Sequence, residues 1–364
     1  MRVINKMRKI KLFKWIKPFG LIILLGIIIS HWVSSIELPL FIRIRDIIYF
    51  HRVNHIENKD NTEVYVYYKH SKKAIYNPVT HAQVVLKDAR KILNDQINSM
   101  YYLEEDCSEY VDTIKLLIVS KSLMNFADTV TINGIDCYRF SYDMDYPIYD
   151  LKKGWFSGMA QGHAIQIMLG AYLITHDTLY LQNAEKFANL LSIPIEMGGV
   201  REDVLGGYWF EEYAQNGTSQ HPRVLNGHIF AIDGLFYLSQ ISDNPIYKEL
   251  LTNGINSVEI NIDRYNIGYF WSRYDYFNTV ANEYYHQLHI EQLRRILEIN
   301  KDLPNIQKNR KLFIIGKYIP LGIFYRIIYS HNRMLFVLIV FNTLNVIIIY
   351  MLLLFIRFKC SKEP

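Results

Sequence analysis

The sequence is poor in cysteine, and this scarcity limits the kinds of site that it can hold. Its 364 residues include three cysteines, Cys107, Cys137 and Cys360, and no Cys-x-x-Cys spacing. A zinc site built from cysteine pairs and a disulfide-rich scaffold are therefore excluded. Cys107 and Cys137 would pair only in an oxidising compartment, so we expect free thiols, and we predict no metal site.

The middle of the chain lacks a surplus of positive charge. The formal net charge is +5, but lysines and arginines near the two ends supply all of this surplus, and residues 50–300 contain 21 lysines and arginines against 31 aspartates and glutamates. A nucleic-acid-binding domain needs a basic patch or stripe. The charge balance therefore predicts that nucleic acid is not a partner.

Two uncharged and strongly apolar runs lie near the two ends of the chain. The first covers residues 19–36 and follows seven lysines and arginines, and the second covers 23 residues, 334–356. Because about 20 apolar residues span a bilayer as a helix, we predict a transmembrane helix in each run. A cleaved signal peptide is the alternative for the first run, but no Ala-x-Ala-like cleavage site follows it.

Basic residues beside these runs predict an orientation. Segment 1–18 and the tail 357–364 are both basic, so we expect both in the cytoplasm and the domain between the runs outside it. Six further basic residues lie in segment 304–333, which can instead lie on the membrane surface as an amphipathic stretch. Together with the Ile, Lys, Asn and Tyr usage, these features predict a membrane protein of the bacterial cell envelope.

The residues between the runs predict a mainly α-helical fold. Segment 37–77 is expected to be a linker with a short β region, and residues 78–303 a helical domain with a β insertion at 110–145, in which TIKLLIVS is a strand and Asn133-Gly134 a hairpin turn. Residues 170–191 and 234–255 share one rhythm, namely an amphipathic helix, a polar turn and a second helix. A third partial copy covers 293–306. Repeated helix pairs of this size predict an α/α-barrel, a toroid of helical hairpins.

Three stretches carry polar and aromatic residues that such helices do not need. They are KKGWFSGMAQGHA at 152–164, a Gly-rich stretch at 198–228 that contains YWFEEY, and GYFWSRYDYF at 268–277 followed by EYYHQLHIEQLRR at 283–295. The first also fits a tight turn. For the second we expect a long structureless loop, which tends to be functional. Aromatic rings beside carboxylates suit a sugar ligand, but a solvated pair, Glu211 and Glu212, beside a packed strand fits as well.

These stretches resemble, in order and in spacing, the three signature blocks of the C-terminal domain of D-glucuronyl C5-epimerases: GWFSGMAQGHAI, GGYWFEEYAQNGTSQHPRVLNGHIFAIDGLFYL and YYHQLHIEQL. The resemblance covers roughly residues 78–300. It implies an α/α-barrel preceded by β structure, and an activity that converts glucuronate to iduronate in heparosan-type polysaccharides. By position in the motifs EEY, YD and YH..H it implies the catalytic residues Glu212, Tyr213, Tyr274 and Tyr285. As substrate-binding residues we predict Trp155, Gln161, Arg223, Asn226, Arg273, His286 and His289.

The chain departs from the family pattern at three places. Ala214 stands where the family usually has proline, and His163 stands where it has a second glutamine. Phe277 stands where the animal enzymes have arginine. Arg273 or Arg223 is then the candidate for binding the substrate carboxylate, so the substrate itself is left open.

The resemblance implies a reaction that needs two proton carriers on opposite faces of the sugar. A uronate C5–H is a very weak acid, and its removal needs stabilisation of the ene-diolate that forms. We expect Tyr285 and Glu212 to carry protons while Tyr213 and Tyr274 orient the sugar. His286 and His289 would hold Tyr285 or bind the carboxylate, although His289 fits a structural role equally well. No cofactor is expected.

Two other classes of function fit the same residues. A polysaccharide lyase or hydrolase on a helical toroid shares the first steps, and a non-catalytic glycan-binding envelope protein shares the binding surface. In each case the partners that we expect are a uronic-acid polysaccharide and membrane lipid, and a homodimer is left open.

Overall fold

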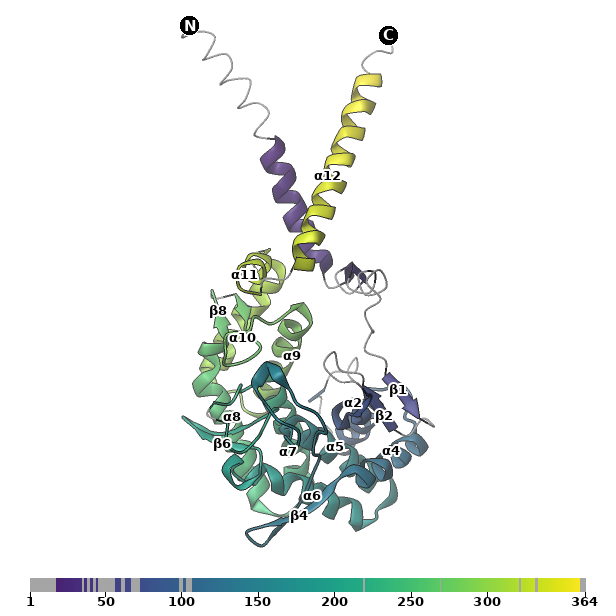
Figure 1. The fold of residues 1–364 in the computed structure, drawn as a ribbon, viewed down its shortest axis with the longest axis vertical. Coiled ribbons are helices and arrows are strands. Elements are labelled where there is room, and N and C mark those ends of the chain that lie inside the picture. Colours follow the sequence, from purple (N-terminus) through teal and green to yellow (C-terminus); the bar gives the residue numbers. More distant parts are fainter. Residues whose placement is uncertain are drawn as a thin grey trace.

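The computed structural model describes residues 18–34, 36–37, 40–41, 44, 56–59, 63–66, 73–97, 101–102, 107–218, 220–268, 270–320, 322–330 and 333–360, and over these residues the chain is mainly helical, as predicted. Figure 1 shows a helical domain with two apolar helices that project from one end. Three predicted segments lie partly outside the described residues: residues 1–17 of the basic segment, much of the linker 37–77 and the last part of the tail 357–364.

Antiparallel helix pairs build the domain. They are α3 (Leu86–Ile97) with α4 (Thr113–Phe126), α5 (Gly158–Thr175) with α6 (Thr178–Ser192), α7 (Leu225–Ile241) with α8 (Pro245–Asn261), and α9 (Glu283–Ile299) with α10 (Pro304–Tyr318), preceded by the short α2 (Pro78–Gln83). The polar turns act as helix caps: Asp177 accepts a hydrogen bond from Leu179 N at 2.9 Å, and Asn244 one from Ile246 N at 3.1 Å. Such side chains satisfy the free N–H groups of a first turn, and the three repeated helix pairs are confirmed.

The helices form two layers around one apolar core. In the inner layer α5 packs between α3 and α7, and α7 packs against α9, while α4, α6, α8 and α10 each cover a neighbour from outside. Gly162 permits the close approach of α5 to α7, because a Cβ there would collide with Phe230 O. The structure therefore confirms the helical hairpins, and closure of the predicted toroid stays a prediction.

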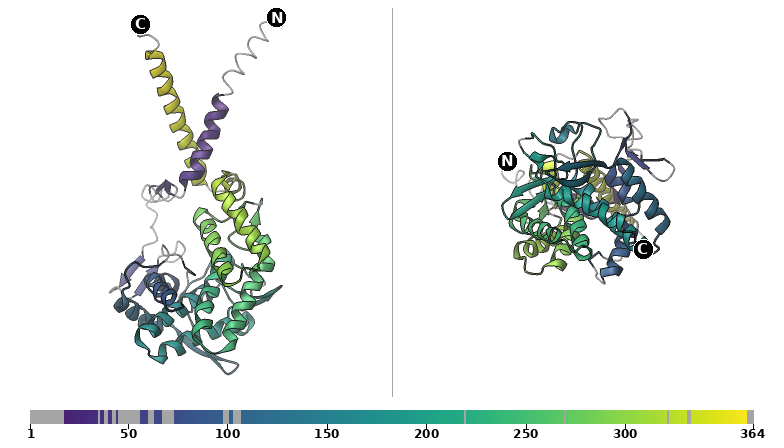
Figure 2. Two further views of the ribbon diagram at one scale, coloured as in Figure 1. Left: turned by 180° about the vertical axis from the view of Figure 1, so that it is seen from behind. Right: turned by 90° about the horizontal axis from the view of Figure 1, so that it is seen from below.

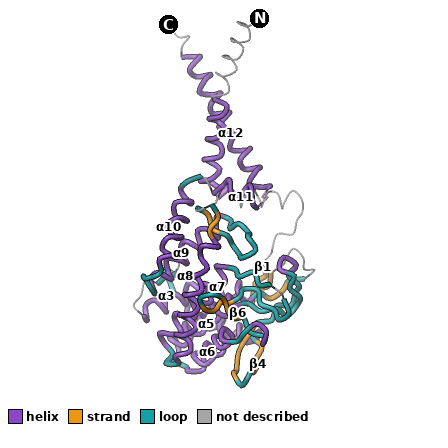
Figure 3. The backbone as a smooth tube through the Cα atoms, turned by 90° about the vertical axis from the view of Figure 1, so that its left-hand side faces the viewer, coloured by secondary structure: helices purple, strands orange, loops and turns teal. Residues whose placement is uncertain are grey.

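Short strands lie among the helices, and the β4–β5 hairpin lies at the end far from the apolar helices (Figure 3). The predicted N-terminal β region is a three-stranded antiparallel sheet of β1 (Ile56–Lys59), β2 (Glu63–Val66) and β3 (Ile75–Tyr76). Hairpins are formed by β4 (Asp128–Ile132) with β5 (Ile135–Arg139), β6 (Arg201–Val204) with β7 (Gly207–Phe210), and β8 (Asn266–Ile267) with β9 (Trp271–Ser272). Asn133 and Gly134 have φ of 53° and 79°, so the predicted hairpin turn is confirmed.

Two predictions of local structure are wrong. The expected strand TIKLLIVS is the first half of α4, whose N-terminus is capped by Asp112 and whose residues Leu116, Val119 and Leu123 bury one face. The cap and the helical spacing outweigh the β-branched composition. The stretch 198–228 is not structureless, because it contains the β6–β7 hairpin and the start of α7.

The apolar ends of the chain are helical and touch each other. Within the described residues, Met334–Phe358 in α12 (Arg333–Cys360) is the one helix long and apolar enough to cross a membrane, and Pro18–Ser34 is a shorter apolar helix. The predicted span at 19–36 therefore stays a prediction. Asn342 Nδ2 donates to Ser30 Oγ at 3.2 Å and to Glu37 Oε2 at 2.9 Å. Figure 2 shows from behind that the helix Pro18–Ser34 and α12 project from the same side of the domain.

The predicted amphipathic segment 304–333 forms α10 and α11 (Gly322–Ser330), and it is joined to the domain. α10 packs against α9, with Phe313 fully buried. Cys107 and Cys137 are both buried thiols, and no disulfide joins them, as expected.

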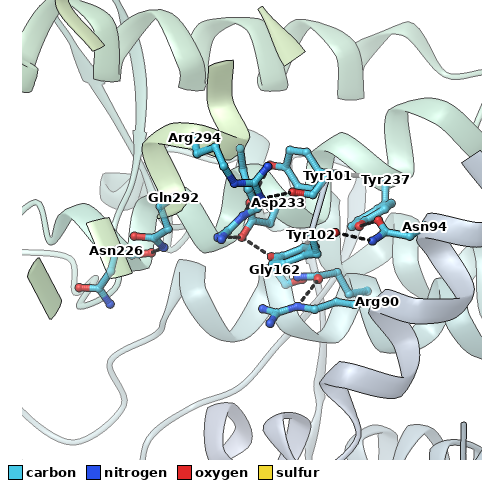
Figure 4. Close-up of polar contacts among 12 residues, drawn as sticks. Arg90, Asn94, Tyr101, Tyr102, Gly162, Asn226, Asp233, Tyr237, Gln292 and Arg294 are labelled. Carbon is cyan, nitrogen blue, oxygen red and sulfur yellow. Dashed lines mark hydrogen bonds and ion pairs between the residues drawn. The ribbon is translucent and has the colours of Figure 1, made fainter. Parts of the chain in front are cut away.

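A buried ion pair ties α7 to α9. Asp233 Oδ2 lies 2.8 Å from Arg295 Nη2, and Tyr101 and Tyr102 donate to the same carboxylate at 2.7 and 2.5 Å (Figure 4). Burial alone would raise the pKa of Asp233, but Arg295 and the hydrogen bonds from the tyrosines hold it below its usual value. The carboxylate is therefore ionised inside the core.

We expect Asp233→Asn to lower the free energy of unfolding by about 3–5 kcal/mol, because it leaves Arg295 charged and unpaired in the core. Asp95→Asn is the matched control: Asp95 forms an exposed i, i+4 pair with Lys91 at 3.0 Å, a pair worth less than about 1 kcal/mol. Denaturant titration of the detergent-solubilised protein, followed by circular dichroism, measures both. Equal losses in the two variants would contradict the assignment.

Candidate active site

A cavity of about 320 Å³ lies between the first turn of α9, the segment after β7 and the segment before α5. This volume is at the small end of the range for ligand pockets. Five predicted site residues line it, namely Trp155, Glu212, Tyr213, Asn226 and Tyr285. A sixth, Tyr274, contacts Tyr285, with ring centroids 4.6 Å apart.

Backbone pairing fixes the segment that carries Glu212 and Tyr213. Phe156 N donates to Ala214 O and Ala214 N donates to Phe156 O, both at 2.9 Å, and Gly158 N donates to Glu211 O at 2.7 Å. The two stretches that the sequence singled out on chemical grounds are therefore neighbouring extended segments. Their side chains face one cavity because the backbones are hydrogen-bonded to each other.

An asparagine cap fixes the position of Tyr285. Asn282 Oδ1 accepts a hydrogen bond from Tyr285 N at 2.9 Å, so α9 begins with an ordinary cap immediately before the aromatic residues. Tyr285 therefore lies in the first turn of a helix whose later turns pack in the core.

Glu212 is a buried carboxyl group with little to stabilise its charge. Burial raises its pKa to about 7, and a hydrogen bond with Tyr213 opposes the rise. Asn226 Nδ2 lies 3.5 Å from Glu212 Oε2. The carboxyl group rests against α7 at Gly227, where a Cβ would collide with Glu212 Oε2. At neutral pH this group exchanges a proton readily, which suits a general base or acid.

Aromatic rings form one wall of the cavity. Tyr213 stacks on Tyr146 with centroids 4.9 Å apart and an interplanar angle of 11°, and Trp155 lies 5.3 Å from Tyr213. Trp155 in turn stacks on Tyr142 at 3.8 Å and donates its Nε1–H to Met144 O at 3.0 Å. Such a rigid apolar wall with hydroxyl groups at its edge can pack against the face of a sugar.

The tyrosines are neutral phenols. Burial, and then the charge of Glu212, raise the pKa of Tyr285 to about 12, against a hydrogen bond with Tyr274 that lowers it. Burial and Glu212 also raise the pKa of Tyr274, against a hydrogen bond with Tyr213. Glu212, Tyr213, Tyr274 and Tyr285 thus influence one another's protonation, and the tyrosines are proton donors at neutral pH.

Both predicted histidines have partners in the core. His286 stacks on Trp271 at 3.8 Å, accepts from Ser272 N at 3.1 Å and lies 3.0 Å from Phe313 O. His289 Nδ1 lies 2.9 Å from Ser272 Oγ. Burial lowers the pKa of both to about 3, so both are neutral. Neither lines the 320 Å³ cavity, and their contacts fit the structural role that was one of the sequence alternatives.

The other predicted binding residues also lie away from the cavity. Arg223 pairs with Glu202 through two hydrogen bonds of 2.7 Å, and Arg273 Nη1 donates to Arg264 O at 3.2 Å. Gln161 is fully buried in α5. Among the described residues that line the cavity there is no lysine, arginine or histidine.

Sequence reasoning missed three residues of this region. Tyr146 lines the cavity and stacks on Tyr213, and its signal was the run of tyrosines and aspartates just before the first block. Tyr284 lines the cavity with 71% of its surface exposed. Glu211 is not solvated: it is buried and accepts from Arg223 N at 3.1 and 3.2 Å. Composition and spacing treated Glu211 and Glu212 alike, and only the resemblance to the family singled out Glu212.

The comparisons with known proteins converge on the same region. The family model described as D-glucuronyl C5-epimerase C-terminus matches residues 133–313. Over 170 residues the chain is 32% identical to the D-glucuronyl C5-epimerase of Caenorhabditis elegans, covering 42% of this chain and 27% of that protein. Over 185 residues it is 29% identical to an uncharacterised protein of Methanocaldococcus jannaschii, covering 49% and 59%. The chain thus spans less than two thirds of both relatives.

The raised pKa of Glu212 predicts a change of stability with pH. The folded value of about 7 exceeds the usual value of 4.5, so Glu212 contributes stability below about pH 4.5 that is lost as the pH rises to 7. Relative to Glu212→Gln, we expect the wild-type free energy of unfolding to fall by about 3 kcal/mol between pH 4.5 and 7. Denaturant titrations across this pH range measure the difference. Glu298→Gln, on the half-exposed outer face of α9, should parallel the wild type, and a Glu212→Gln curve that does the same would contradict the assignment.

Proposed function

Because residues 133–313 belong to the D-glucuronyl C5-epimerase C-terminus family, we propose that this chain is a membrane-anchored polysaccharide uronate C5-epimerase. It converts D-glucuronate residues to L-iduronate within the polymer. One observation carries the proposal: Glu212 and Tyr285 line the same small cavity. Glu212 is a carboxyl group with a pKa of about 7, and Tyr285 is a neutral phenol.

The proposed reaction begins with Glu212 as the base. Ionised Glu212 removes the proton from C5, and the electron pair of the broken C–H bond moves into the carboxylate to form an ene-diolate. Tyr285 then gives its hydroxyl proton to C5 from the opposite face, which inverts the configuration. The raised pKa of Tyr285 favours this direction, because a neutral phenol is an acid and not a base.

The same side chains complete the proton balance. After one turnover Glu212 has gained a proton and Tyr285 has lost one. Glu212, Tyr213, Tyr274 and Tyr285 shift one another's pKa values, and the rings of Tyr274 and Tyr285 lie 4.6 Å apart. A proton transferred along this row resets both groups with no external reagent, so Tyr213 and Tyr274 serve as carriers as well as contacts for the sugar.

Neutral donors stabilise the ene-diolate in this proposal. The described lining holds no basic residue, but it does hold the amide of Asn226, the hydroxyl of Ser157 and several phenols. Hydrogen bonds in a water-poor site are worth more than in water. Arg223 and Arg273 form hydrogen bonds with other partners, so neither binds the substrate carboxylate in this proposal.

The proposal includes anchoring by α12, which is long and apolar enough to cross a membrane. The basic residues at both ends favour cytoplasmic termini and an extracytoplasmic domain. A polysaccharide would then meet the site at the outer face of the cell membrane.

Isotope exchange tests the reaction. We expect the purified protein in D₂O to place deuterium at C5 of a glucuronate-containing polymer, with chain length unchanged, and to form iduronate detectable by proton NMR. Glu212→Gln and Tyr285→Phe should each lower this exchange about 10²–10⁴-fold. Absorbance from unsaturated ends would indicate a lyase, and polymer binding with no exchange would indicate a glycan-binding protein. Either result overturns the proposal.

The pH profile tests the role of Glu212. We expect kcat/KM to rise with pH and to level off above about 7, because Glu212 must lose its proton before it can accept one from C5. Initial rates of deuterium incorporation between pH 5 and 9 provide the measurement. A profile that is flat from pH 5 to 7 would exclude Glu212 as the base.

A further inference from the structure

A second and larger cavity adjoins the first. It has a volume of about 930 Å³ and shares four lining residues with the 320 Å³ cavity, namely Gln83, Phe230, Tyr284 and Leu288. A polymer threaded past Glu212 and Tyr285 must leave the small cavity, and the shared wall leads directly into the larger one.

The far wall of the larger cavity comes from elements that do not line the small cavity. His31, Trp32 and Ser34 belong to the apolar helix Pro18–Ser34, Lys317 and Tyr318 end α10, and Arg326 lies in α11. The family match covers residues 133–313, so these six residues lie outside it.

Specific contacts hold that wall in place. His31 Nε2 lies 3.0 Å from Lys317 O, and Trp32 Nε1 donates to Tyr318 O at 3.3 Å. Ser34 donates to Glu283, which also pairs with Arg326 at 3.1 Å. The apolar helix therefore docks on α9 and α10 by directed bonds, and it contributes a built surface to the cavity.

Three exposed aromatic rings line this cavity. Trp32, Tyr284 and Tyr318 have 60%, 71% and 64% of their surfaces exposed. Exposed rings of this size are costly in water unless they have a ligand or a membrane to cover them. The flat C–H faces of pyranose rings are suitable ligands for them.

The charges of the cavity favour an anionic ligand. Arg90 and Lys317 line it, whereas the two acidic residues of the lining have basic partners: Glu283 pairs with Arg326, and Glu291 with Arg294 at 3.3 Å. Positive charge in a concave site attracts a polyanion. Uronate units supply both the pyranose face and the carboxylate.

We propose that the larger cavity binds the uronate units that flank the reacting unit, with the apolar helix Pro18–Ser34 and the end of α10 as one wall of the substrate site. This inference rests on the proposed function. It makes the N-terminal helix part of substrate recognition and gives the enzyme a preference for long chains.

Substrates of defined length test the inference. The full chain is assayed in detergent by deuterium incorporation, with a short oligosaccharide that fills the small cavity alone and a decasaccharide of the same polymer. We expect the wild type to have a KM for the decasaccharide about tenfold lower, and Trp32→Ala or Tyr284→Ala to remove most of this difference, about the effect of losing one ring-stacking contact. Tyr110→Ala is the control, because Tyr110 is 84% exposed and lines neither cavity.

A second variant tests the charges. Lys317→Gln should make the KM for the decasaccharide less sensitive to salt, because one screened attraction is lost. Thermal unfolding of each variant identifies those that fail to fold, and Trp32→Phe should restore the length preference.

The outcomes separate this inference from the proposed function. No deuterium with either substrate contradicts the function. Exchange with equal KM for both lengths in the wild type contradicts the inference alone. A length preference that survives Trp32→Ala and Tyr284→Ala also overturns it, and in that case weaker binding of Trp32→Ala to lipid vesicles would assign the ring to the membrane interface.

Discussion

The site depends on the burial of one carboxyl group without a cation beside it. Glu212 and Asp233 are both buried, yet their pKa values shift in opposite directions. Arg295 and two tyrosines hold Asp233 ionised, whereas Glu212 has only the opposing bond from Tyr213 and rises to about 7. The ion pair of Asp233 with Arg295 joins α7 to α9, whereas Glu212 can exchange a proton near neutral pH. An arginine beside Glu212 would lower its pKa and weaken it as a base.

Local patterns predicted the helix pairs because caps and apolar spacing act within a few residues, as at Asp177 and Asn244. They failed at α4, where a β-branched run is helical because its apolar face meets the core. In the site, the family blocks identified Glu212 and Tyr285. The blocks did not show that Arg223, unlike these two residues, lies away from the cavity. Its side chain pairs with Glu202 in β6. The spacing of residues along the chain does not predict tertiary partners of this kind.

The departure from the family pattern at Ala214 has a structural counterpart. Ala214 N donates a hydrogen bond to Phe156 O, and proline has no N–H to donate. In this chain Ala214 and Phe156 exchange two backbone hydrogen bonds, whereas a proline at position 214 would keep only the one that it accepts. The substitution therefore adds a fixed contact next to the carboxyl group instead of removing one.

The hydrogen bond between Ser34 and Glu283 also affects how the domain is attached to the apolar helices. Glu283 begins the helix that carries Tyr285 two residues later, and the helix that ends at Ser34 meets α12 at Asn342. Direct contacts therefore run from the apolar helix pair to the first turn of α9. Side-chain contacts, and not the chain connection alone, therefore fix the position of the domain relative to the two apolar helices.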